Sequence, residues 1–336
     1  MRGSAVRAIG LAGLGIGAIA IASRRAVDRR DRFYEWSGEH LRIDDGTAEF
    51  SLPMVYHRSE QIVSLHPAAM APVRAILPTD DLHPVRLPDG RALVAVSAGR
   101  YLEGTADGTD PDALRYGEVM VGVLVTRRPA PPLVPLLRSM LAADTTAAPG
   151  VFILHNAVTS RASRDTARAY GYPAFVADFA SEEDLTERRV HLAEDGRDIL
   201  ALRVAATGRI SRDRSPMITY GIHGDEVVEA IAPCSALVQQ HFGRRGGRLE
   251  LGDHPVADMI RDLDPSPEPM VTRSYLNLRI LIPPTRVVGR ARTYTGYAGS
   301  DRELGTYTMR YPGGAAIDMH AGAREPGPVP LGVAVG

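Results

Sequence analysis

The sequence contains no lysine, since all 39 residues counted as lysine or arginine are arginine. Arginine stays protonated at any pH that a folded protein tolerates, so it cannot act as an amine nucleophile. Because the chain has no lysine amine, Schiff-base catalysis, a lysine anchor for pyridoxal phosphate and a P-loop lysine are all excluded. Any carbonyl chemistry of this chain must therefore proceed without an imine.

Cysteine is nearly as scarce, because Cys234 is the only one in 336 residues. A disulfide within the chain is impossible and a cysteine-based zinc site is disfavoured. The net charge of -1 gives no basic excess that would favour nucleic acid. The sequence holds no H-E-x-x-H and no G-x-S-x-G, and its histidines follow no metal-ligand spacing. We expect no metal, no cofactor and no nucleic-acid partner.

One uncharged apolar run occupies residues 8–22, and arginines follow it more densely than they precede it. As a helix this run would span roughly 22 Å, short of the ~30 Å hydrocarbon core. By the positive-inside rule it predicts a membrane anchor over residues 1–32 with a cytoplasmic main domain. Two alternatives stay open: a signal peptide cleaved after Ala-Ile-Ala at 20–22, with export, or an apolar helix docked on the domain or a partner.

Beyond residue 33 the pattern changes to short apolar runs divided by glycine, proline and aspartate. Some of these runs alternate with period two, as at Leu276, Leu278, Ile280 and Ile282. This pattern is typical of antiparallel strands in a sandwich or barrel. The predicted strands are 61–66, 91–97, 118–126, 151–158, 199–205, 217–222, 275–282 and 286–297.

Helical patterns are few, and there is no alternation of strands with helices. Residues 68–76, 133–142 and 226–240 predict short helices, the last interrupted by a proline. We therefore expect a mainly β (α+β) domain over residues 33–323. A proline- and glycine-rich tail follows at 324–336.

Four fragments, taken in order, resemble the acetoacetate decarboxylase superfamily. Arg58 precedes a predicted strand, and Tyr-Gly-Glu at 116–118 leads into another. Residues 168–178 read RAYGYPAFVAD, similar to the family's Tyr/Phe-Pro-Lys-Lys element. Residues 275–283 resemble its late strand ending in Ile-Pro. The resemblance covers roughly residues 55–300, and it implies an antiparallel β-barrel or cone that forms homo-oligomers.

The resemblance also implies a lost reaction. In the family, one lysine forms an imine with the substrate and a neighbouring lysine lowers its pKa. Those two positions hold Ala174 and Phe175 in this chain. Alanine cannot form an imine, so the family's decarboxylation is expected to be absent. A further family acid falls near Ser97, which is another departure.

Two family positions survive. The resemblance implies a catalytic role for Glu118 and a substrate-binding role for Arg58, and it places Tyr172 and Phe175 at the same site. An ordinary salt bridge between Glu118 and Arg58 is the alternative. We expect a protein that binds a small oxo- or carboxylic acid, with or without a lysine-independent lyase or hydratase activity. The competing hypothesis is a non-catalytic, membrane-tethered scaffold or ligand-binding protein.

Overall fold

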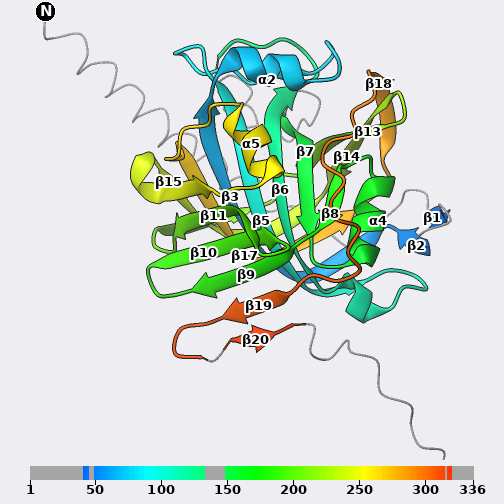
Figure 1. Cartoon of the computed structure of the whole chain (residues 1–336), viewed down its shortest axis with the longest axis vertical. Helices are drawn as coiled ribbons and strands as arrows, with labels where there is room; N and C mark the ends of the chain where they lie inside the picture. The colour runs from blue at the N-terminus through cyan, green and yellow to red at the C-terminus, as the bar shows by residue number, and fades with distance from the viewer. Residues whose placement is uncertain (1–40, 45–48, 133–147, 315, 320–336) are drawn as a thin grey trace, which may run out of the picture.

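The computed structural model describes most of the predicted domain, and strands dominate it (Figure 1). The described residues are 41–44, 49–132, 148–314 and 316–319. The apolar segment at 1–32, the helix predicted at 133–142 and the tail at 324–336 lie outside them. Within the described ranges, no helix has the length and hydropathy needed to cross a membrane.

The largest element is a twelve-stranded, mostly antiparallel sheet. Its central strands are long, and their inward and outward faces are both largely buried. Burial on two faces explains why several of these strands read as nearly continuous apolar runs. In spatial order the main path is β12 (Arg209–Asp213), β15 (Cys234–Phe242), β17 (Val271–Ile282), β3 (Met54–Ala68), β5 (Ala92–Thr105), β6 (Tyr116–Thr126), β7 (Gly150–Val158), β13 (Met217–His223), β14 (Glu226–Ala232) and β18 (Arg286–Arg290), with β4 (His83–Pro84) beside β6 and β8 (Ala174–Val176) beside β7.

The predicted antiparallel β fold is confirmed, but the sheet is not a closed barrel. In the described part of the chain, no ladder joins β12 and β18, the two ends of the path. The inner face nevertheless comes together across the sheet. Tyr56 and Tyr101 from its centre share a buried cluster with Ala230 of β14 and Val238 of β15.

A second sheet of six strands packs on the opposite face of the large sheet. Ile62 and Ala98 of the large sheet share a core with Val190 and Leu202 of the smaller one. Figure 1 shows β9, β10 and β11 crossing in front of the longer strands. The strands in spatial order are β16 (Gly247–Leu251), β11 (Arg197–Ala205), β10 (Glu187–Glu194), β9 (Asp178–Glu183), β19 (Tyr307–Arg310) and β20 (Ile317–Asp318), and a separate hairpin joins β1 (Leu41–Asp44) to β2 (Glu49–Leu52).

The helices of the described ranges are short and lie between strands. Helix α2 (Met70–Ile76) confirms the helix predicted at 68–76. Helix α4 (Arg161–Ala169) begins where the Ser160 hydroxyl accepts the backbone N–H of Ser163, and α5 (Pro255–Arg261) begins with proline at its first turn. Two 3-10 turns complete the set, η2 (Pro111–Leu114) and η4 (Arg244–Gly246).

The helix predicted at 226–240 is wrong. The region forms two strands, β14 and β15, separated by Pro233. Proline supplies no N–H for either a helix or a ladder, and the β-branched Val227 and Val228 suit a buried strand. Pairing of β14 with β13, and of β15 with β17, outweighs the weak helical periodicity.

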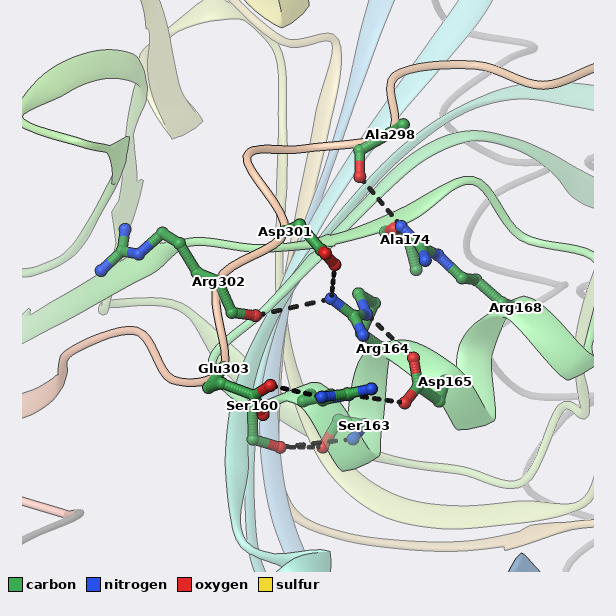
Figure 2. Close-up of polar contacts among 11 residues, drawn as sticks. Ser160, Ser163, Arg164, Asp165, Arg168, Ala174, Ala298, Asp301, Arg302 and Glu303 are labelled. Carbon is green, nitrogen blue, oxygen red and sulfur yellow. Dashed lines mark hydrogen bonds and ion pairs between the residues drawn. The ribbon is translucent and has the colours of Figure 1, made fainter. Parts of the chain in front are cut away.

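Ion pairs hold helix α4 to the segment 298–303 (Figure 2). The buried Arg164 guanidinium lies 2.9 Å from the buried Asp165 carboxylate and 3.0 Å from the exposed Asp301 carboxylate. Arg161, which is half exposed, pairs with Glu303 and lies 3.5 Å from Asp165. Arg164 is therefore the cation on which the buried acid of this helix mainly depends.

Replacing Arg164 should destabilise the fold far more than replacing Arg161. We expect Arg164→Met to lower the free energy of unfolding by about 3 kcal/mol, because it leaves Asp165 buried beside a weaker partner. Arg161→Met, at an exposed pair, should cost about 1 kcal/mol or less. Urea unfolding followed by circular dichroism measures both, and equal losses would contradict this account.

Two histidines are buried in the neutral form. The Nδ1 of His66 donates to the Ser266 carbonyl at 2.8 Å, and burial lowers the pKa of His66 to about 4. Neither ring nitrogen of His155 has a hydrogen-bond partner among the described residues. Burial, and then the neighbouring His254, lower the pKa of His155 to about 4. Both imidazoles therefore resist protonation until the protein unfolds.

Stability should fall as the pH drops below about 6.5. The unfolded chain takes up protons at these histidines near pH 6.5, whereas the folded chain does so only near 4. Each histidine should thus lower the free energy of unfolding by about 2 kcal/mol between pH 7.5 and pH 5. Urea titrations at the two pH values test this, with His155→Leu expected to halve the difference, because His66 remains, and the exposed His223→Leu to leave it unchanged.

Candidate active site

The site is centred on Glu118, in the middle of the large sheet. Glu118 of β6 pairs with Gly99 of β5, and Gly99 pairs with Gln61 of β3. Laterally paired residues direct their side chains to the same face of a sheet. A Cβ at Gly99 would lie 3.6 Å from the Tyr101 ring and 3.8 Å from Cγ of Gln61. Gln61 and Tyr101 therefore lie beside Gly99, a position that carries no side chain, and Glu118 pairs with it on the next strand.

The neighbouring row of the same face brings Ala174 to the site. Ser97 of β5 pairs with Met120 of β6, which pairs with Asn156 of β7, which pairs with Ala174 of β8. Ala174 and Asn156 are almost completely buried, whereas Ser97 and Met120 are partly exposed. The structure thus places Glu118 and Ala174 on one face, next to a stretch of sheet that solvent reaches.

Glu118 is only 6% exposed, and its carboxyl group receives two hydrogen bonds. The Tyr101 hydroxyl donates to Oε2 at 2.9 Å, and Nδ2 of Asn156 donates to Oε1 at 3.0 Å. Burial raises the pKa of Glu118, and the two hydrogen bonds oppose that rise. Each carboxyl oxygen accepts one bond, which leaves room for an acid proton.

Tyrosines enclose the carboxyl group. The Tyr101 ring stacks on Tyr116 with centroids 4.6 Å apart, and Tyr56 lies 4.4 Å from Tyr101. The Tyr172 hydroxyl lies 2.6 Å from Oγ1 of Thr219. Burial raises the pKa of these four tyrosines, and the Glu118 charge adds to each rise. The phenols therefore remain neutral around Glu118.

The structure does not bring Arg58 to Glu118. Arg58 is exposed on β3, and the β3–β5 ladder is irregular on both sides of it. Its charge acts instead on Tyr311, which follows β19. The expected convergence of these two residues therefore does not occur, because the irregular ladder interrupts the alternation that a sequence reading assumes.

Phe175 faces the opposite side of the sheet from Ala174. Its ring packs edge-on against Tyr297 at 5.0 Å, within the core shared with the smaller sheet. Successive residues of a strand point to opposite faces, so Ala174 and Phe175 cannot both face Glu118. Of the residues expected at the site, the structure gathers Glu118, Ala174 and Tyr172 and separates Arg58 and Phe175.

Three site residues escaped the sequence reasoning, namely Gln61, Tyr101 and Asn156. Each lies inside a predicted strand or just beyond its end, where a polar residue had no motif to mark it. Period-two spacing from Ser97 through Gly99 to Tyr101 does place these positions on one face. Placing Gln61 and Asn156 on that face requires knowing which strands are neighbours, and the sequence alone does not give that order. Within the described residues, no group of three or more His, Cys, Asp or Glu could hold a metal ion.

Comparisons with known proteins give a match in fold alone. No family profile and no curated protein matches the sequence. Acetoacetate decarboxylase from Legionella pneumophila is 16% identical, with a TM-score of 0.54 over 79% of this chain and 97% of that chain. Another acetoacetate decarboxylase gives 15% identity and 0.52, over 71% and 90%. The enduracididine biosynthesis enzyme MppR complexed with pyruvate gives 13% identity and 0.50, over 70% and 90%.

These likenesses confirm the predicted resemblance at the level of the fold. The chain has the acetoacetate decarboxylase-like fold, and it covers at least 90% of each of the three structures named above. At such low identity the fold alone carries over, and residue roles must be argued from the site itself.

The titration of Glu118 should respond to Tyr101 more than to Tyr116. Tyr101→Phe removes a donor to the carboxylate, so it should raise the pKa of Glu118 further. Tyr116→Phe is a matched control, because the Tyr116 hydroxyl lies 3.4 Å from that of Tyr56 and no described hydrogen bond joins it to Glu118. Carboxyl titration by infrared difference spectroscopy against Glu118→Gln measures the shift, and equal responses would contradict the assignment.

Proposed function

We propose that this protein binds a small carbonyl compound on the inner face of its large sheet and acts on it without an imine. The protonated Glu118 transfers its proton to the carbonyl oxygen while a solvent water takes the proton from the adjacent C–H bond, which gives the neutral enol, and the Glu118 carboxylate then regains a proton from solvent. The activity is of the lyase or hydratase type, proceeding through an enol. The observation that carries this proposal is the buried Glu118, whose pKa burial raises and which bonds to Asn156, the residue paired with Ala174.

The surroundings of Glu118 support a proton donor. Desolvation disfavours the carboxylate, so part of the population keeps its proton at a pH where an exposed glutamate is ionised. The phenols around it are neutral and supply no charge that would fix the proton elsewhere. Ser97 and Met120, partly exposed in the next row, give a ligand a route to this face.

The chemistry around Ala174 supports a route without an imine. A methyl group offers no nucleophile, and the chain has no lysine that could replace it. The pyruvate bound by the structurally similar MppR supports a small carbonyl ligand for this fold. General acid catalysis by Glu118 is the mechanism that the remaining side chains can supply.

A second candidate function is binding without turnover. Both oxygens of Glu118 already accept hydrogen bonds, and the tyrosine rings pack closely beside it. That arrangement favours a rigid ligand-binding site in which the acid fixes orientation. The two candidates differ in whether the bound carbonyl compound exchanges its α-protons with solvent.

Proton exchange separates the two candidates. The full chain should accelerate deuterium uptake into the methyl group of hydroxyacetone or pyruvate, followed by proton NMR. We expect Glu118→Gln to slow the catalysed exchange by about 100-fold, the usual contribution of a general acid. Glu103→Gln, at an exposed glutamate on the neighbouring strand, is the matched control and should exchange as the wild type does. Equal exchange rates in all three proteins would favour binding without turnover.

A further inference from the structure

Two buried side-chain amide oxygens on the Glu118 face lack hydrogen-bond partners among the described residues. They are Oε1 of Gln61 and Oδ1 of Asn156. Gln61 is 6% exposed and Asn156 is 1% exposed. A buried acceptor left without a donor costs about 1–3 kcal/mol, and a ligand that supplies a donor recovers that cost.

The nitrogens of the same two amides are already committed. Nε2 of Gln61 donates to Oγ of Ser97 at 2.7 Å, and Nδ2 of Asn156 donates to Oε1 of Glu118 at 3.0 Å. These bonds anchor each amide with its oxygen directed away from the bonded partner. Gln61 pairs with Gly99 and Asn156 contacts Glu118, so both residues lie on the sheet face of the proposed function, where their oxygens are candidate acceptors for a ligand.

Cations are poorly placed to hold an anionic ligand there. Arg58 is exposed and does not reach Glu118. Arg273 pairs with Val63 in the Ser97 row, but it already forms an ion pair with Asp213. Nε of Arg273 has no described hydrogen-bond partner, but Asp213 already neutralises the charge of this guanidinium. A carboxylate next to Glu118 would therefore be buried near a cation that is already paired, which is unfavourable.

We infer that the ligand is a neutral carbonyl compound that carries an O–H or N–H donor, such as a hydroxyketone or a 2-oxo amide. Its donor binds the carbonyl oxygens of Gln61 and Asn156, while its own carbonyl oxygen accepts from Glu118. This inference rests on the proposed function for the carbonyl group, and it replaces the expected oxo- or carboxylic acid with an uncharged ligand. Gln61 and Asn156 thereby set specificity.

Three compounds of nearly equal size test the ligand class. Pyruvamide is neutral and has a donor, methyl pyruvate is neutral without one, and pyruvate is an anion. Calorimetric titration of the full chain should give pyruvamide about tenfold tighter binding than either of the others, the equivalent of one buried hydrogen bond. Tighter or equal binding of pyruvate or methyl pyruvate would overturn the inference, and a pyruvate preference lost in Arg273→Met would assign an anion site instead.

Substitution of the Gln61 side-chain amide provides a second test. Gln61→Met keeps the side-chain length but removes the acceptor, so it should reduce pyruvamide binding about tenfold and leave methyl pyruvate unchanged. Gln240→Met, on the partly exposed end of β15, is the matched control. Unchanged pyruvamide affinity in Gln61→Met, with folding verified by thermal melting, would show that water satisfies the oxygen and would overturn the inference.

The outcomes separate this inference from the proposed function. Proton exchange that depends on Glu118, with no preference for pyruvamide, leaves the proposed function in place and removes the ligand class. A preference for pyruvamide without proton exchange keeps the ligand class and favours binding without turnover. No binding of any of the three compounds, together with no exchange, overturns both.

Discussion

The burial of one carboxyl group is the constraint on which the site depends. A carboxylate at Glu118 would lose most of its hydration, so the surrounding residues must either pair it or favour its proton. Tyr101 and Asn156 supply two neutral donors, and no ion pair joins Glu118 to a cation among the described residues. The result is an acid held between its two protonation states by opposing effects, burial against hydrogen bonding. The tyrosines around Glu118 stay neutral, so they add no charge that would shift its protonation.

Alternation along a single strand gives the adjacent residues Ala174 and Phe175 different surroundings. Ala174 faces the Glu118 site, whereas Phe175 faces the core between the two sheets. Ala174 therefore determines which chemistry the site can support, and Phe175 determines how the sheets pack around Tyr297. An apolar side chain at 175 does not make the site more apolar, because it lies on the other side of the backbone.

Arginine takes structural roles in this lysine-free chain. Arg164 joins α4 to the segment 298–303, and Arg168 donates to the backbone carbonyl oxygens of Ala174 and Ala298. A planar guanidinium can reach several acceptors at once, which suits it to tying a helix to two separate segments. These contacts fix β8 at the edge of the site, so the position of Ala174 depends on charges that lie outside the site (Figure 2).

The sequence by itself determined the strand-rich class, most strand positions, the resemblance to acetoacetate decarboxylase and the exclusion of an imine, because periodicity and residue identity are local properties. It failed at 226–240, where lateral pairing outweighed a weak helical period. Only the tertiary structure decided that Glu118 contacts Asn156 and shares a sheet face with Gln61 while Arg58 stays outside. Those relations depend on strand order and on an irregular ladder beside Arg58, which join residues far apart in the chain.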